Sequence, residues 1–173
     1  GRGSTCYFTV RLGVSTTGPP VAQVVPRAMV EGTRVLVVDD NVTNLRILEE
    51  MLGNWHMRPT TSSSVVQAME VLRASQADGP PIDLMLVDAT MPEQDGLELA
   101  DQVRADPRLT HPVIMMLTSG GRPGDIARCD ELEIAAYLLK PVKQSELFDT
   151  IVQVLGITTV AQADDKSEVQ QLT

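Results

Sequence analysis

A hydrophobic run that stops on a carboxylate is the first candidate for chemistry. Five of the six residues at positions 82–87 are apolar, and Asp88 follows them directly. Apolar residues without alternation are typical of a strand that is buried on both faces of a parallel sheet. Asp88 would then lie at the carboxyl end of that strand, the edge of an α/β sheet where ligands bind. Pro92 disfavours helical geometry in the residue before it, so we expect a loop over residues 89–92.

Three other apolar runs also end at polar side chains. They occupy residues 34–38, 113–117 and 135–139. The side chains that follow them are the carboxylates of Asp39 and Asp40, the hydroxyl of Thr118 and the ammonium group of Lys140. Because the carboxyl ends of parallel strands meet at one edge of a sheet, we expect these groups to share a pocket with Asp88.

The expected pocket combines three carboxylates with a hydroxyl and an ammonium group. Carboxylates this close repel one another, and they are tolerated only when a bound cation or a proton offsets the charge. Mg²⁺ prefers oxygen ligands of this kind and takes one or two carboxylates together with phosphate oxygens and water. Thr118 and Lys140 supply the groups that the remaining phosphoryl oxygens would require. The pattern predicts Mg²⁺-assisted phosphoryl transfer onto Asp88 as the nucleophile.

The elements that must position these groups alternate between strand and helix. Leu45, Leu48, Met51 and Leu52 recur at spacings of three and four residues, which predicts a helix that stops at Gly53 and Asn54. Similar patterns predict further helices after each of the later strands. Their cores are expected at residues 66–72, after N-cap candidates at 62–64, and at 97–104, 125–132 and 145–155.

This alternation predicts the fold class α/β, with five βα units forming a doubly wound parallel sheet. Residues 57–61 are a weak strand candidate that contains Pro59, and proline is tolerated only at the edge of a sheet. The strand order 2-1-3-4-5 is the doubly wound order that puts the second strand at an edge. We therefore expect that order here.

Composition limits the classes of partner. The 173 residues allow one domain of ordinary size with appendages, and the formal net charge is −9. This balance argues against nucleic acid or an anionic membrane surface as the direct partner. No apolar run approaches the roughly 18 residues of a membrane helix. With two cysteines, Cys6 and Cys129, a disulfide framework is not expected, and we predict a cytoplasmic location.

The candidate residues, taken in their order along the chain, form a pattern that resembles the receiver domain of two-component response regulators. The resemblance covers about residues 32–157 and implies the flavodoxin-like receiver fold. It rests on Asp39-Asp40, Asp88 with Met91-Pro92 and Gly96, Thr118-Ser119, and Tyr137 with Lys140-Pro141.

The resemblance implies a role for each candidate residue. Asp88 would be the phospho-acceptor, and Thr118 and Lys140 would contact the phosphoryl oxygens. The Mg²⁺ ligands would be Asp39, Asp40, Asp88 and the backbone carbonyl of Thr90. Tyr137 would be an aromatic switch residue that turns inward on activation, although simple core packing is an alternative for it.

The resemblance also implies a phosphorelay switch and a partner that carries phosphohistidine, either a kinase or a phosphotransfer domain. The chain would accept a phosphoryl group and assist its own dephosphorylation without being an enzyme by itself. A weak homodimer is compatible with this interpretation.

The chain termini suggest a larger parent protein. Residues 1–13, which contain Gly1-Arg2-Gly3-Ser4 and Phe8, resemble the last strand of the ATP-binding domain of sensor histidine kinases. Residues 39–44 resemble the start of receivers that are fused to such kinases. We therefore expect a kinase remnant over 1–13, a linker over 14–31, the receiver over 32–157 and a tail or second linker over 158–173. The parent would be a hybrid histidine kinase.

Two other functions are alternatives to this one. A haloacid-dehalogenase-like phosphatase also uses an aspartate nucleophile and Mg²⁺, but it needs a second aspartate two residues later, where this chain has Thr90. A phosphorylation-independent interaction module would be expected to lack one of the acidic residues, the threonine or the lysine. None of them is missing here.

Overall fold

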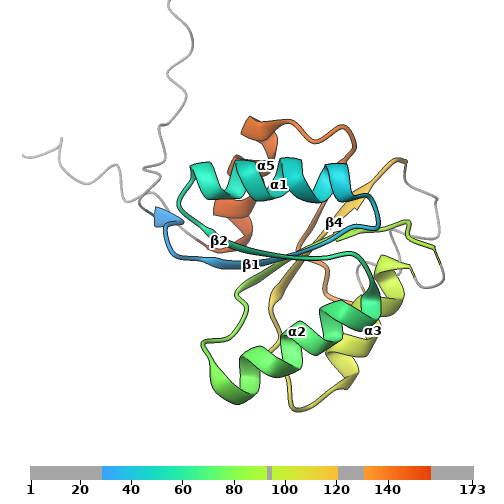
Figure 1. Cartoon of the computed structure of the whole chain (residues 1–173). Helices are drawn as coiled ribbons and strands as arrows, with labels where there is room; N and C mark the ends of the chain where they lie inside the picture. Colours follow the sequence, from blue (N-terminus) through green and yellow to red (C-terminus); the bar gives the residue numbers. More distant parts are fainter. Residues whose placement is uncertain (1–28, 93–94, 121–130, 157–173) are drawn as a thin grey trace, which may run out of the picture.

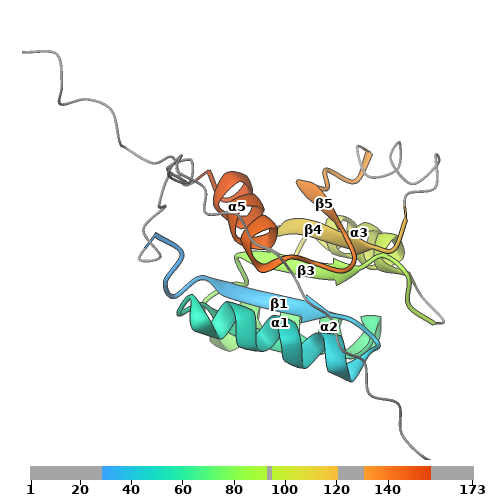
Figure 2. The ribbon, with the colours of Figure 1, turned by 90° about the horizontal axis from the view of Figure 1, so that it is seen from above.

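The computed structural model describes residues 29–92, 95–120 and 131–156, and these form one parallel sheet with helices on both faces. The strands are Arg34–Val38 (β1), Arg58–Ser62 (β2), Leu84–Asp88 (β3), Val113–Thr118 (β4) and Ala136–Leu139 (β5). All four pairings between neighbouring strands are parallel, in the order β2-β1-β3-β4-β5. The predicted fold class and strand order are confirmed, and β2, which contains Pro59, lies at an edge. Figure 2 shows β1, β3, β4 and β5 in succession across the sheet.

Helices cover the sheet on both sides. They are Val42–Asn54 (α1), Val65–Asp78 (α2), Gly96–Ala105 (α3) and Gln144–Val154 (α5). In Figure 1, α1 and α5 lie above the sheet, and α2 and α3 lie below it. The predicted helix at residues 125–132 falls mostly outside the described residues.

Each face of the sheet has its own hydrophobic core, because side chains alternate between the two faces along a strand. Leu36, Met85 and Ile114 point toward α2 and α3 and pack in one core. Val37, Leu86 and Met115 pack in the other, with buried residues of α1 and α5. β3 is buried along its whole length, as the unbroken apolar run predicted.

The predicted end of the first helix is confirmed: α1 ends at Asn54, and the chain turns at His56, which has a left-handed φ of 60°. One detail of the predicted elements was wrong. β5 is not fully buried: Tyr137 and Leu139 are exposed, whereas Leu138, which alternates to the face of α1 and α5, is buried.

The packed structure begins slightly before the expected boundary at position 32. Val30 is 0% exposed and belongs to the core between the sheet and α1 and α5. The backbone NH of Gly32 donates to the carbonyl of His56 at 2.9 Å, which fixes this entry to β1. The kinase remnant and the remaining domain boundaries lie in residues outside the described ranges, and they stay predictions. Within the described ranges, no helix is both long and apolar enough to cross a membrane.

Candidate functional site

The register of the sheet brings two of the predicted carboxylates together. Val38 of β1 pairs with Val87 of β3, so the next residues along the two strands, Asp39 and Asp88, are neighbours at the same edge. Val37 and Leu86, two positions earlier, both face α1 and α5, and alternation directs the two aspartates to that face. Asp39 is 0% exposed and Asp88 is 5% exposed. Two carboxylates are therefore held in a largely buried place.

Lys140 bridges these two aspartates. Its Nζ lies 2.9 Å from Asp39 Oδ2 and 2.7 Å from Asp88 Oδ2. The backbone NH of Lys140 donates to the carbonyl of Thr118 at 2.7 Å, which ties the end of β5 to the end of β4. Burial by itself lowers the pKa of Lys140, but its hydrogen bonds to Asp88 and Asp39 outweigh that effect and raise the pKa above its usual value. The lysine is therefore a fixed positive charge at neutral pH.

Asp39 has further hydrogen-bond donors from the start of α1. The backbone NH of Asn41 donates to Asp39 Oδ1 at 2.8 Å. The side-chain amide of Asn44 donates to both oxygens, at 3.2 Å to Oδ1 and 3.1 Å to Oδ2. Asn44 is a site residue to which the sequence interpretation gave no role. The signal available in the sequence was its place in the first turn of the predicted helix, just after the two aspartates.

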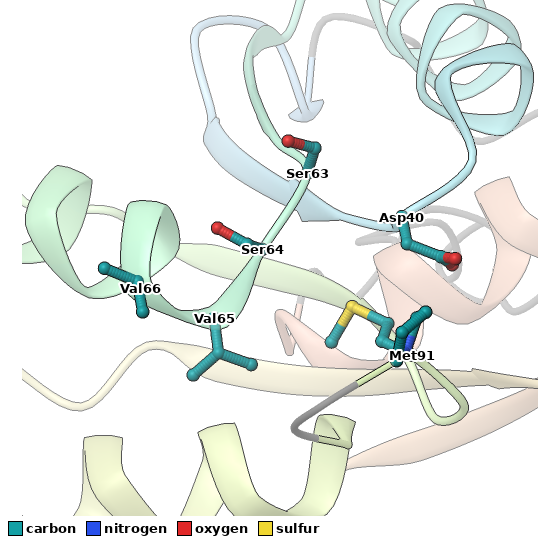
Figure 3. Close-up of a pocket in the computed structure, with 7 residues that line it drawn as sticks. Asp40, Ser63, Ser64, Val65, Val66 and Met91 are labelled. Carbon is teal, nitrogen blue, oxygen red and sulfur yellow. The ribbon is translucent and has the colours of Figure 1, made fainter.

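Asp40 lies at the other side of the cluster. It is exposed, and it lines a shallow pocket of about 170 Å³ at the start of α2. The other lining residues are Ser63, Ser64, Val65, Val66, Met91 and Pro92. Figure 3 shows Asp40 at the end of β1 facing Met91, with Ser63 and Ser64 across the pocket. Asp40 is therefore the carboxylate of the three that is most open to solvent.

The three carboxylates form the acidic cluster that the sequence predicted. One oxygen from each of Asp39, Asp40 and Asp88 can be chosen so that all three lie within 4.8 Å of one another. Such a set of hard oxygen donors fits Mg²⁺. Because Lys140 pairs with Asp39 and Asp88 and its single charge cannot balance three carboxylates, a divalent cation would offset the remaining negative charge.

The structure does not bring every predicted residue into this cluster. The Thr118 hydroxyl is engaged with its own loop, since it donates to the carbonyl of Gly120 and accepts from the NH of Gly120, both at 3.2 Å. Leu117, the register partner of Asp88, packs on the face of α1 and α5, so Thr118 alternates to the other face. The backbone NH of Thr90 donates to Asp88 Oδ1 at 3.2 Å. Tyr137 is 55% exposed, which argues against the alternative of simple core packing.

Gly96 allows the loop after Asp88 to close tightly on the strand. A Cβ at this position would lie 2.3 Å from the backbone carbonyl oxygen of Asp88 and 3.0 Å from Val87 Cγ1. The backbone NH of Gly96 also donates to the carbonyl of Ala89 at 3.3 Å. A side chain here would push α3 away from the strand end that carries Asp88.

We expect Gly96→Ala to lower the free energy of unfolding by about 2–3 kcal/mol, the usual cost of a group that cannot fit without a backbone shift. Gly53→Ala is the matched control. Gly53 is in α1 with open space around its Cα, and alanine there should raise stability by about 0.5–1 kcal/mol. Urea unfolding followed by Trp55 fluorescence measures both. Equal stability of Gly96→Ala and wild type would contradict the close approach.

Comparisons with known proteins agree with this fold. The family model of the response regulator receiver domain matches residues 35–152. The two-component response regulator ARR11 of Arabidopsis thaliana is 38% identical over 116 residues, which are 67% of this chain and 21% of that protein. The two-component response regulator ORR13 of Oryza sativa subsp. japonica is 33% identical over 113 residues, 65% of this chain and 90% of that protein. The chain thus spans about a fifth of the length of the first relative.

Solved structures show the same similarity. The signal receiver domain of an HD domain-containing protein from Pseudomonas fluorescens Pf-5 is 26% identical with a TM-score of 0.64, over 73% of this chain and 97% of that one. A sensor protein from Polaromonas sp. JS666 is 25% identical with a TM-score of 0.63, over 72% of this chain and 96% of that one. Residues 35–152, which the family model matches, include all of the sheet except Arg34, together with Asp39, Asp40 and Asp88. This chain belongs to the response regulator receiver domain family.

Proposed function

We propose that the chain accepts a phosphoryl group on Asp88 from a phosphohistidine and works as a switch in a phosphorelay. The observation that carries the proposal is the place of Asp88: its carboxylate is 2.7 Å from the Lys140 ammonium group and lies in a cluster with Asp39 and Asp40. An Asp88 carboxylate oxygen would attack phosphorus while the bond from phosphorus to the imidazole nitrogen breaks. Lys140 is placed to neutralise charge on the phosphoryl oxygens.

Mg²⁺ is the proposed cofactor, held by Asp39, Asp40 and Asp88. The backbone carbonyl of Thr90 is the proposed further ligand. When bound, it would supply positive charge that offsets the phosphoryl oxygens and the carboxylates. The chain's own part is to hold the aspartates in place before the phosphodonor arrives, through Lys140, Asn44 and the backbone NH of Thr90.

Thr118 and Tyr137 are the proposed switch residues. The Thr118 hydroxyl makes two hydrogen bonds to Gly120 of its own loop, and both would have to break for it to turn toward a phosphoryl group on Asp88. Tyr137 is on the neighbouring edge strand and is exposed, so it has room to move inward. A phosphoryl group would in this way shift the conformations of two neighbouring segments, the loop after β4 and the strand β5.

The proposed partner is a histidine kinase or phosphotransfer domain that carries phosphohistidine, and the proposed location is the cytoplasm. We further propose that the parent protein is a hybrid histidine kinase. The kinase-like motif in residues 1–13 and the likeness to a sensor protein from Polaromonas sp. JS666 support that origin.

Incubation with acetyl phosphate tests the function. We expect the protein mass to rise by one phosphoryl group in Mg²⁺ and not in EDTA, and the label to be lost in both acid and base. Reduction with borohydride followed by peptide mapping should place it on Asp88. Labelling on a histidine or serine, or equal labelling in EDTA, would overturn the proposal.

A further inference from the structure

We propose that Asn44 is a positioning residue for the acidic site: its amide fixes the Asp39 carboxylate, and Asp39 in turn holds Lys140 beside Asp88. This inference rests on the proposed function of that site. Asn44 belongs to α1 and touches neither Asp88 nor Lys140 in any hydrogen bond of the described residues, so it would act through Asp39 alone.

The contacts of Asp39 show what Asn44 contributes. Asp39 Oδ1 accepts from the backbone NH of Asn41, and Oδ2 accepts from Lys140 Nζ. The Asn44 amide is the group that reaches both oxygens, at 3.2 and 3.1 Å. A donor that spans the two oxygens resists rotation of the carboxylate about its Cβ–Cγ bond. Without it, one contact on each oxygen would remain to set that rotation.

The identity of residue 44 is not explained by helix formation. Asn41 already caps α1, because its side chain accepts from the backbone NH of Thr43 at 2.9 Å. Asparagine inside a helix is less favourable than alanine, and the first turn of a helix ordinarily favours an acidic residue. The first turn of α1 has no acidic residue. An amide here donates to Asp39 without adding a fourth negative charge to the cluster, which accounts for the choice.

The consequence for the site follows from the distances. Lys140 Nζ is 2.9 Å from Asp39 and 2.7 Å from Asp88, so the orientation of Asp39 sets one of the two contacts that hold the ammonium group in place. The same carboxylate contributes an oxygen to the cluster that fits a divalent cation. Groups that orient a ligand in this manner are commonly worth tenfold to a hundredfold in metal affinity.

The experiment compares Asn44→Ala with Asn54→Ala in the whole chain. Asn54 is exposed at the other end of the same helix, so this variant makes the same side-chain change away from the acidic cluster. We expect the Kd for Mg²⁺, measured by calorimetric titration at a temperature where all proteins are folded, to rise about tenfold to a hundredfold in Asn44→Ala. It should stay at the wild-type value in Asn54→Ala. Wild-type affinity in both variants would overturn the inference.

A second variant tests whether the amide group itself matters. Asn44→Gln restores an amide donor and should recover most of the lost affinity, whereas a purely structural role of residue 44 would change the melting temperature without changing the Kd. Equal Kd values for the alanine and glutamine variants would count against a positioning role.

These titrations separate the inference from the proposed function. Mg²⁺ affinity is measured without a phosphodonor, so the Asn44 result stands even if wild type fails to accept a phosphoryl group. If wild type is labelled by acetyl phosphate at saturating Mg²⁺, Asn44→Ala should be labelled at least tenfold more slowly, because Lys140 is displaced from Asp88. An unchanged labelling rate of Asn44→Ala at saturating Mg²⁺ would mean that Asn44 does not position Lys140. That result would overturn this half of the inference.

Discussion

Asp88→Asn is expected to abolish phosphoryl incorporation from acetyl phosphate, reducing the labelled fraction from most of the protein to none. The amide oxygen of asparagine is not a nucleophile, and no other described carboxylate takes the place of Asp88 at the end of β3 beside Lys140. Intact-protein mass spectrometry after incubation with Mg²⁺ and acetyl phosphate measures the effect directly.

The variant should keep its fold, which makes the result interpretable. Asparagine is the same size as aspartate and can still accept from Lys140, and Lys140 keeps its ion pair with Asp39. Trp55, the single tryptophan, is 3% exposed and packs edge-on against Phe148 with ring centroids 5.0 Å apart, so its fluorescence reports the native core.

Asp83→Asn is the matched control. Asp83 is the other carboxylate of the same segment. It lies just before β3, at the end of the strand opposite to Asp88, and it accepts from the backbone NH of Arg34. The control should be labelled like wild type, and labelling of Asp88→Asn would disprove the assignment.

The sheet and the cluster could be predicted because both depend on local patterns. An unbroken apolar run such as residues 84–87 indicates a strand that is buried on both faces. A polar residue directly after the run therefore lies where the carboxyl ends of the strands meet. Pro59 then indicated the strand order, because a strand that contains proline is tolerated at an edge of the sheet and the order 2-1-3-4-5 puts the second strand there. From these two constraints the proximity of Asp39 and Asp88 follows without any knowledge of packing.

What could not be predicted depends on side-chain orientation and on contacts between distant segments. Thr118 follows its strand just as Asp88 does, but alternation and the hydrogen bonds to Gly120 take its hydroxyl away from the carboxylates. The double contact of Asn44 with Asp39 depends on the rotation of α1 about its axis, which hydrophobic spacing gives only approximately.

Asp40→Asn is expected to raise the free energy of unfolding of the metal-free protein and to remove most of its response to Mg²⁺. Asp40 lies with Asp39 and Asp88 in a cluster of carboxylate oxygens within 4.8 Å, and Lys140 pairs with the other two aspartates and not with Asp40. Because Asp40 is exposed, the repulsion is reduced by solvent, and we expect the gain to be about 1 kcal/mol.

Bound Mg²⁺ should stabilise wild type by RT ln(1 + [Mg²⁺]/Kd), about 2.7 kcal/mol at a hundredfold excess over Kd. The variant, having lost the most accessible of the proposed ligands, should gain much less.

Thermal unfolding of both proteins in EDTA and in Mg²⁺ gives the four values that this prediction needs. Glu50→Gln removes the same charge from an exposed position on α1, so it controls for the general effect of net charge on a chain with a formal charge of −9. The control should show little gain in EDTA and the full Mg²⁺ response. If Asp40→Asn were less stable than wild type in EDTA and kept the whole Mg²⁺ response, Asp40 would not be a ligand, and the divalent cation would have to bind elsewhere. Greater stability in EDTA together with a lost Mg²⁺ response is the pattern expected of a carboxylate that is kept for a cation at a cost to the stability of the fold.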